Sequence, residues 1–139
     1  MTENQQDEEF FVSKAAMISI IDDDSWVRES TADLITSLGH KALTFASGEQ
    51  FLASGHLKDT SCVITDLEMP GFNGLDLQER LLAEGYRTPI IFITAYPKDA
   101  ARSRALEAGA VAFLSKPFRE DSLINSLAIA LKRWEEFEH

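Results

Sequence analysis

Reactive side chains stand at the end of, or directly after, four apolar runs in the chain. They are Asp22 with Asp23, Asp66, Thr94 and Lys116. Carboxylate oxygens select a hard cation such as Mg²⁺, and a carboxylate beside that cation can act as a nucleophile on phosphorus. An ammonium and a hydroxyl surround a moving phosphoryl group with positive charge and donors, and the backbone N–H of Ala95 is a third donor. These residue types therefore favour phosphoryl chemistry supported by a divalent cation.

Short apolar runs are expected to position these side chains. Runs rich in β-branched residues are typical of buried strands, and five are expected, over 17–21, 41–46, 62–65, 89–94 and 111–115. Helical spacing predicts helices after Ser25, from Ser47 through Leu52, from Gly74 to near Gly85, over 98–108 and over about 120–134. This alternation implies an α/β fold, a doubly wound five-stranded parallel sheet in a three-layer sandwich with five helices. Because the carboxyl ends of parallel strands share one edge, the reactive side chains should meet there.

The helix ends carry recognisable signals. Ser25 is expected to be the N-cap of the first helix, with Asp24 as a second capping candidate, and Gly39 is expected to be its C′ residue. Ser47 and Gln50 have the spacing of a capping box. These signals place the start of each helix close to the carboxyl end of the strand before it.

The composition limits the class of protein. The chain has 139 residues, 45% of them hydrophobic and 26% charged, as expected for one globular domain. Its net charge of −10 argues against direct nucleic-acid binding, which needs basic surface. No apolar run approaches the ~20 residues of a membrane span, and no signal pattern precedes the domain. The single cysteine, Cys62, fits a reducing compartment, so a cytoplasmic location without a membrane partner is expected.

Four motifs resemble one family. The stretches IIDDD, VITDLEMPGFNG, PIIFITA and FLSKPF occur in the order and at the spacings of response-regulator receiver domains from bacterial two-component signal transduction. The acidic composition without clear periodicity predicts a flexible leader over 1–15, and the acids near the other end predict a tail or the start of a linker over 135–139. The resemblance implies a receiver domain over residues 16–134. It also implies a flavodoxin-like sheet with strand order 2-1-3-4-5.

The resemblance implies a role for each reactive residue. Asp66 would be the phosphoacceptor, and Lys116 would pair with the phosphoryl oxygens. Thr94 would move to hydrogen-bond one of these oxygens, and Phe113 would change rotamer with it. A Mg²⁺ ion, with Mn²⁺ as the alternative, would be held by Asp22, Asp23, Asp66 and the backbone carbonyl of Glu68. The Lys116–Pro117 peptide bond would be cis.

The resemblance implies that the protein is a signalling switch and not an enzyme. Its only catalytic activity would be its own phosphorylation and dephosphorylation. A sensor histidine kinase or a small phosphodonor would supply the phosphoryl group, which biases an existing two-state equilibrium. The output surface would be the fourth helix, fifth strand and fifth helix, about residues 98–134, which would also form a homodimer after phosphorylation. Charged candidates on this surface are Arg102, Arg104, Arg119 and Lys132. Glu68 and Tyr96 offer no carboxamide to position water, so a long-lived phosphoryl state is expected.

Three alternatives compete with this interpretation. A phosphohydrolase would use Asp66 as its nucleophile, but it needs a general acid, for which Glu68 is the nearest candidate, and a substrate cap. A nucleotide or flavin module would need a glycine-rich phosphate loop of standard spacing, which the sequence lacks. A protein that binds DNA directly would need more basic charge than this chain carries.

Overall fold

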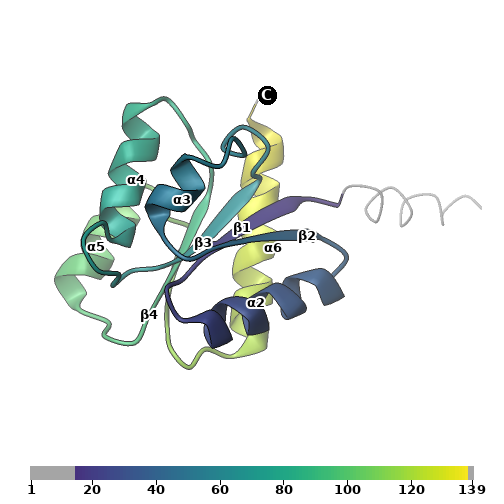
Figure 1. Cartoon of the computed structure of the whole chain (residues 1–139), viewed down its shortest axis with the longest axis horizontal. Helices are drawn as coiled ribbons and strands as arrows, with labels where there is room; N and C mark the ends of the chain where they lie inside the picture. The colour runs from purple at the N-terminus through teal and green to yellow at the C-terminus, as the bar shows by residue number, and fades with distance from the viewer. Residues whose placement is uncertain (1–14, 138–139) are drawn as a thin grey trace, which may run out of the picture.

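Strands and helices alternate along the chain in the computed structural model, which describes residues 15–137 (Figure 1). The strands are β1 (Met17–Ile21), β2 (Lys41–Phe45), β3 (Cys62–Asp66), β4 (Ile90–Thr94) and β5 (Ala112–Ser115), and the helices are α2 (Ser25–Ser37), α3 (Gly48–Leu52), α4 (Gly74–Ala83), α5 (Asp99–Glu107) and α6 (Glu120–Glu136). All neighbouring strands are parallel, in the order β2-β1-β3-β4-β5. The expected fold class, strand order and five helices are confirmed. The leader predicted over 1–15 lies almost wholly outside the described residues.

The sheet is covered on both faces because its strands alternate side chains between two cores. One core joins Val63 and Phe92 to Leu77 of α4, and α3 and α5 cover the same face. The other core joins Ile64 and Ile91 to α2 and α6. Side chains that neighbour each other along a strand point to opposite faces, so continuous apolar strands supply both cores. Figure 1 shows the resulting three layers.

The helix caps correct two of the expected signals. Asp24, not Ser25, is the N-cap of α2, because its carboxylate accepts from the Trp26 and Val27 N–H groups. Ser25 is the first residue of the helix. The earlier acid accepts these bonds because its carboxylate oxygen reaches the exposed amides of the first turn.

The capping box predicted at Ser47 is only half formed. Ser47 Oγ accepts from the Gln50 N–H at 3.1 Å, but Gln50 Oε1 accepts from the Ala46 N–H, one residue before the cap. A complete box occurs instead at the start of α4, between Asn73 and Asp76. This pair was not predicted from the sequence.

Several boundaries differ slightly from the expected ones. Helix α6 runs to Glu136, two residues beyond the predicted Trp134, and its N-cap residue Arg119 makes no capping bond. The Arg119 guanidinium donates to the Asp121 carboxylate instead. Gly39 follows α2 with a φ of +92°, as expected for a C′ glycine. Within residues 15–137, no helix is long and apolar enough to span a bilayer.

Candidate functional site

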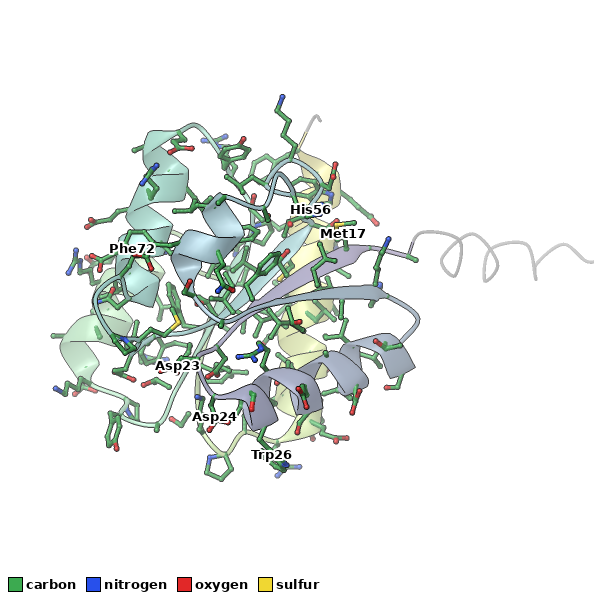
Figure 2. All side chains as sticks on the ribbon, in the orientation of Figure 1. Met17, Asp23, Asp24, Trp26, His56 and Phe72 are labelled. Carbon is green, nitrogen blue, oxygen red and sulfur yellow. The ribbon has the colours of Figure 1, made fainter. Side chains whose placement is uncertain are left out.

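The carboxyl edge of the sheet gathers the charged residues predicted from the sequence. Asp22 follows β1, Asp66 ends β3 and Lys116 follows β5. Lys116 Nζ lies 3.0 Å from Asp22 Oδ2 and 3.5 Å from Asp66 Oδ1. Figure 2 shows Asp23 and Asp24 at the same edge, where β1 passes into α2. Strand ends that are far apart in sequence therefore bring three carboxylates and one ammonium together.

The three carboxylates fit a hard divalent cation. One oxygen each from Asp22, Asp23 and Asp66 lies within 4.8 Å of the other two. Asp22 and Asp66 are buried, whereas Asp23 is exposed and leaves an open side to the cluster. Mg²⁺ prefers oxygen ligands at 2.0–2.1 Å and retains several water molecules. A partly open set of three carboxylates meets this preference with a small inward movement of the side chains.

Asp66 is held in an environment that disfavours its charge. The residue is 5% exposed, and its pKa is raised from 3.8 to about 6. Burial is the largest cause, followed by repulsion from Asp22, whereas the charge of Lys116 opposes the increase. Asp23 and Glu68 add smaller repulsions. An added cation at this position would favour the ionised carboxylate.

Lys116 is the cation that the chain itself places among these acids. Burial lowers the pKa of Lys116, but hydrogen bonding and attraction to Asp22 and Asp66 outweigh burial, so the pKa is raised overall. The ammonium therefore stays charged at neutral pH. The predicted cis Lys116–Pro117 bond is confirmed, and the Lys116 N–H donates to the Thr94 carbonyl at 2.7 Å. This hydrogen bond ties the start of the loop that carries the ammonium to the end of β4.

Two contacts around Asp22 were not predicted from the sequence. Arg28 Nη1 donates to the Asp22 carbonyl at 2.7 Å, from the first turns of α2. The Asp24 N–H donates to Asp22 Oδ1 at 2.9 Å. Both contacts hold Asp22 so that its second carboxylate oxygen faces Lys116. The only sequence signal was the spacing of six residues between Asp22 and Arg28, which is too common to identify a contact.

Thr94 is fully buried at the end of β4, and its hydroxyl is engaged on both sides. Thr94 Oγ1 donates to the Glu68 carboxylate and accepts from the Tyr96 N–H at 3.0 Å. The family resemblance implies a metal-binding role for the Glu68 backbone carbonyl, but the contact of its side chain with Thr94 was not predicted from the sequence. Phe113, the second predicted switch residue, lies in β5 with its ring centroid 6.2 Å from that of Phe92. Both predicted switch residues therefore belong to neighbouring strands.

The loop after β3 passes very close to the strand ends. The Gly74 N–H donates to the Leu67 carbonyl at 2.9 Å, and a Cβ at Gly74 would lie 2.7 Å from the Asp66 carbonyl oxygen. Only glycine allows the start of α4 to approach the backbone of Asp66 this closely. Ala95, the predicted backbone donor, lies in the exposed loop that follows Thr94.

The comparisons with known proteins agree with this geometry. The family model "Response regulator receiver domain" matches residues 18–128. Response regulator protein TodT of Pseudomonas putida is 39% identical over 119 residues, which are 86% of this chain and 52% of TodT. Nodulation protein W of Bradyrhizobium diazoefficiens is 37% identical over 87% of this chain and 53% of its own length. The chain thus spans about half the length of these relatives.

Solved structures give the same result. The response regulator StyR superposes with a TM-score of 0.82 at 36% identity, covering 88% of this chain and 62% of StyR. FixJ-N superposes with a TM-score of 0.78 at 30% identity, covering 91% of this chain and 98% of FixJ-N. The sheet order, the acidic cluster with its lysine and these matches lead to one conclusion: the chain belongs to the response regulator receiver domain family.

Proposed function

We propose that Asp66 accepts a phosphoryl group from a sensor histidine kinase, or from a small phosphodonor, and that this modification switches the domain between two states. The observation that carries the proposal is the position of Lys116 Nζ, 3.0 Å from Asp22 and 3.5 Å from Asp66. An ammonium held there can pair with phosphoryl oxygens as they arrive. The raised pKa of Asp66 supports the proposal, because it shows that added positive charge would stabilise the ionised carboxylate.

The transfer exchanges one phosphorus bond for another. An Asp66 carboxylate oxygen attacks phosphorus, the bond from phosphorus to the donor's imidazole nitrogen breaks, and the imidazole leaves with that electron pair. Lys116 balances the charge on the phosphoryl oxygens, and the Ala95 N–H and the Thr94 hydroxyl supply further donors. A Mg²⁺ ion would be held by Asp22, Asp23, Asp66 and the Glu68 carbonyl, and would supply neutralising charge to the phosphoryl oxygens.

The phosphoryl group brings about −1.5 to −2 charge and three acceptor oxygens to this edge. We propose that Thr94 and Phe113 respond and alter the surface formed by α5, β5 and α6. All four basic candidates on this surface are exposed, and two of them already have an acidic partner: Arg104 pairs with Glu79, and Arg119 pairs with Asp121. An output partner or a second copy of the chain would bind this surface. We expect a long-lived phosphoryl state, because neither Glu68 nor Tyr96 offers a carboxamide to position an attacking water molecule.

A groove next to Lys116 supports docking of a donor protein. It has a volume of about 550 Å³, a mainly apolar lining, and Trp26 and Pro117 among its residues. Trp26 is 75% exposed, an unusual position for a large aromatic side chain (Figure 2). A protein that brings phosphohistidine to Asp66 must cover the neighbouring surface, and this groove would supply apolar contact area.

The experiment uses acetyl phosphate and Mg²⁺ with the wild type, Asp66→Asn and Asp24→Asn. Asp24→Asn is the matched control, because asparagine also caps helices and Asp24 lies outside the predicted ligand set. Intact masses should rise by about 80 Da in the wild type and the control but not in Asp66→Asn, since only Asp66 would carry the phosphoryl group. Chelation by EDTA should prevent the gain, and size-exclusion chromatography should report any dimer. A mass gain in Asp66→Asn would refute the assignment.

A further inference from the structure

The Thr94 hydroxyl has one hydrogen, and that hydrogen is engaged away from the phosphoacceptor. Thr94 Oγ1 donates it to the Glu68 carboxylate, while its oxygen accepts from the Tyr96 N–H at 3.0 Å. A hydroxyl donates to one acceptor at a time. Donation to a phosphoryl oxygen on Asp66 therefore requires the bond to Glu68 to break.

The backbone around Glu68 is well fixed, although its side chain is exposed. Leu67 and Met69 on either side are buried, with exposed fractions of 4% and 8%. The Leu67 N–H donates to the Ile93 carbonyl at 2.9 Å, which extends the β3–β4 pairing to the residue before Glu68. The loop after β3 is thus tied to β4 next to Thr94. This arrangement aims the Glu68 carboxylate at the end of the neighbouring strand.

We propose that Glu68 is a positioning residue that holds the Thr94 hydroxyl in its resting orientation and thereby sets the threshold of the switch. The inference rests on the proposed function, in which phosphoryl oxygens on Asp66 compete with the Glu68 carboxylate for one hydrogen. Glu68 is exposed, so water can hydrate its carboxylate once the bond breaks. Glu68 thus acts on the switch through Thr94 rather than by contact with the phosphoryl group.

The size of the effect follows from the type of bond. A hydrogen bond to a charged acceptor makes a net contribution that corresponds to about a tenfold change in an equilibrium constant. Removal of the Glu68 acceptor should therefore favour the state in which Thr94 faces Asp66 by about tenfold. The gain should disappear when residue 94 has no hydroxyl.

Two variants separate the hydrogen bond from the charge. Glu68→Gln removes the negative charge and keeps a side-chain oxygen that can accept from Thr94. Glu68→Ala removes both the charge and the acceptor. If the bond to Thr94 matters, the two variants should differ; if only the charge near Asp66 matters, they should behave alike.

The first measurement uses the full chain without metal or phosphodonor. NMR couplings of Thr94 report its χ1 rotamer, and the amide shift of Tyr96 reports the bond that the same hydroxyl accepts. The wild type and Glu68→Gln should show one Thr94 rotamer, whereas Glu68→Ala should show rotamer averaging and a shifted Tyr96 amide. A single, unchanged Thr94 rotamer in Glu68→Ala would overturn the proposal.

The second measurement titrates beryllium trifluoride, a phosphoryl mimic, at fixed Mg²⁺ concentration. Glu68→Ala should bind the mimic about tenfold more tightly than the wild type, and Glu68→Gln less than threefold more tightly. In a Thr94→Val background, the Glu68→Ala gain should fall below twofold, as a double-mutant cycle requires for coupled residues. A gain that persists without the Thr94 hydroxyl would show an effect of charge alone and would refute the positioning role.

The outcomes distinguish this inference from the proposed function. Failure of the wild type to bind the mimic, together with no mass gain from acetyl phosphate, would refute the proposed function and this inference with it. A wild type that is phosphorylated, combined with equal behaviour of Glu68→Ala and Glu68→Gln, would refute the inference alone. Urea unfolding of each variant confirms that the compared proteins are folded.

Discussion

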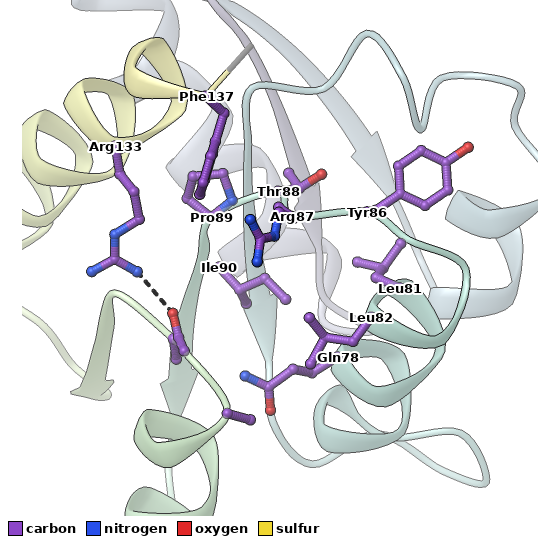
Figure 3. Close-up of a pocket in the computed structure, with 13 residues that line it drawn as sticks. Gln78, Leu81, Leu82, Tyr86, Arg87, Thr88, Pro89, Ile90, Arg133 and Phe137 are labelled. Atoms are coloured by element: carbon purple, nitrogen blue, oxygen red, sulfur yellow. Dashed lines mark hydrogen bonds between the residues drawn. The ribbon is translucent and has the colours of Figure 1, made fainter. Parts of the chain in front are cut away.

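The two edges of the sheet differ in the burial of their charged side chains. At the carboxyl edge, Asp22 is fully buried and Asp66 is 5% exposed, with a single lysine between them. At the amino edge, a pocket of about 280 Å³ is lined by apolar residues such as Leu81 and Ile90 together with Arg87, which is exposed, and Arg133, which is half-buried (Figure 3). Arg133 Nη1 donates to the Gly109 carbonyl at 2.8 Å, and the Arg87 Cζ lies 5.3 Å from the centroid of the Phe137 ring.

The difference separates the residues of the proposed phosphorylation site from residues that cover apolar surface. Burial of like charges costs free energy, so the carboxyl edge is less stable than an apolar edge of the same size would be. The amino edge avoids this cost because its charged groups keep contact with water and cover apolar surface. Variants at the two edges should therefore differ in size of effect, in pH dependence and in response to Mg²⁺.

Removal of the carboxyl-edge cation should have the largest effect. Lys116→Met leaves Asp22 and Asp66 without a positive partner, and the free energy of unfolding at pH 8 should fall by about 3 kcal/mol. Loss of the ammonium should also slow phosphorylation by acetyl phosphate at least tenfold, by an order-of-magnitude estimate. Urea unfolding and intact-mass kinetics measure the two effects.

The exposed Lys132 provides the control for this prediction. Lys132→Met should change stability by less than about 0.5 kcal/mol. Millimolar Mg²⁺ should restore part of the stability of Lys116→Met, because the metal replaces the missing positive charge. Equal losses in the two variants would remove the distinction between buried and exposed cations.

A steric change should have the next largest effect. In Gly74→Ala the added Cβ would meet the Asp66 carbonyl oxygen at 2.7 Å and the Leu67 Cα at 3.1 Å. Because these are backbone atoms, relief requires movement of the loop, and the loss of stability should be about 2–3 kcal/mol. At the amino edge, Gly39→Ala meets no atom within 4 Å and should cost about 1 kcal/mol for its positive φ alone. Thermal unfolding of both variants tests the order, and a smaller loss at Gly74 than at Gly39 would contradict it.

The sequence was sufficient to predict most of the fold, because parallel strands buried on both faces leave a strong signal. The five strands are short, continuous apolar runs, and the helices between them show clear spacing. The strand order came from the resemblance to receiver domains, since the residues themselves do not specify which strands pair. Cap positions were less secure, because Asp24 and Ser25 are both good N-caps and their geometry selects one of them.

The candidate site was predictable in its charged residues but not in its internal contacts. Asp22, Asp66 and Lys116 each follow a strand, and the shared edge of a parallel sheet makes their approach predictable. The bond from Thr94 to Glu68 depends on the path of a loop, and the bond from Arg28 to the Asp22 carbonyl depends on a side-chain conformation. Neither bond leaves a residue spacing in the sequence that would distinguish the two residues from a pair of solvent-exposed side chains without contact.

The raised pKa of Asp66 gives the next prediction, a stability that falls as pH rises. The pKa is about 6 in the folded protein and 3.8 for an ordinary aspartate. Between these values the folded state binds more protons than the unfolded state, so the free energy of unfolding decreases with increasing pH. Asp66→Asn should remove this slope and be more stable than the wild type at pH 8 by on the order of 2 kcal/mol.

Urea unfolding at pH 4, 5, 6, 7 and 8 without Mg²⁺ measures this slope. Mg²⁺ at pH 8 should stabilise the wild type more than Asp66→Asn, because the variant has lost one ionised ligand. An increase in the stability of the wild type relative to Asp66→Asn between pH 4 and pH 7 would contradict the assigned direction of the pKa shift.

The amino edge should give the smallest response and one without pH dependence. Arg133→Met removes the hydrogen bond to the Gly109 carbonyl but keeps an apolar side chain over the pocket, so the loss should be about 0.5–1 kcal/mol. A guanidinium stays charged at all pH values in the assay, so the loss should be the same at pH 5 and pH 8. Phosphorylation by acetyl phosphate should proceed at the wild-type rate, since the pocket lies at the opposite edge from Asp66. A pH-dependent loss, or a slower phosphorylation, would mean that the two edges are coupled through the sheet.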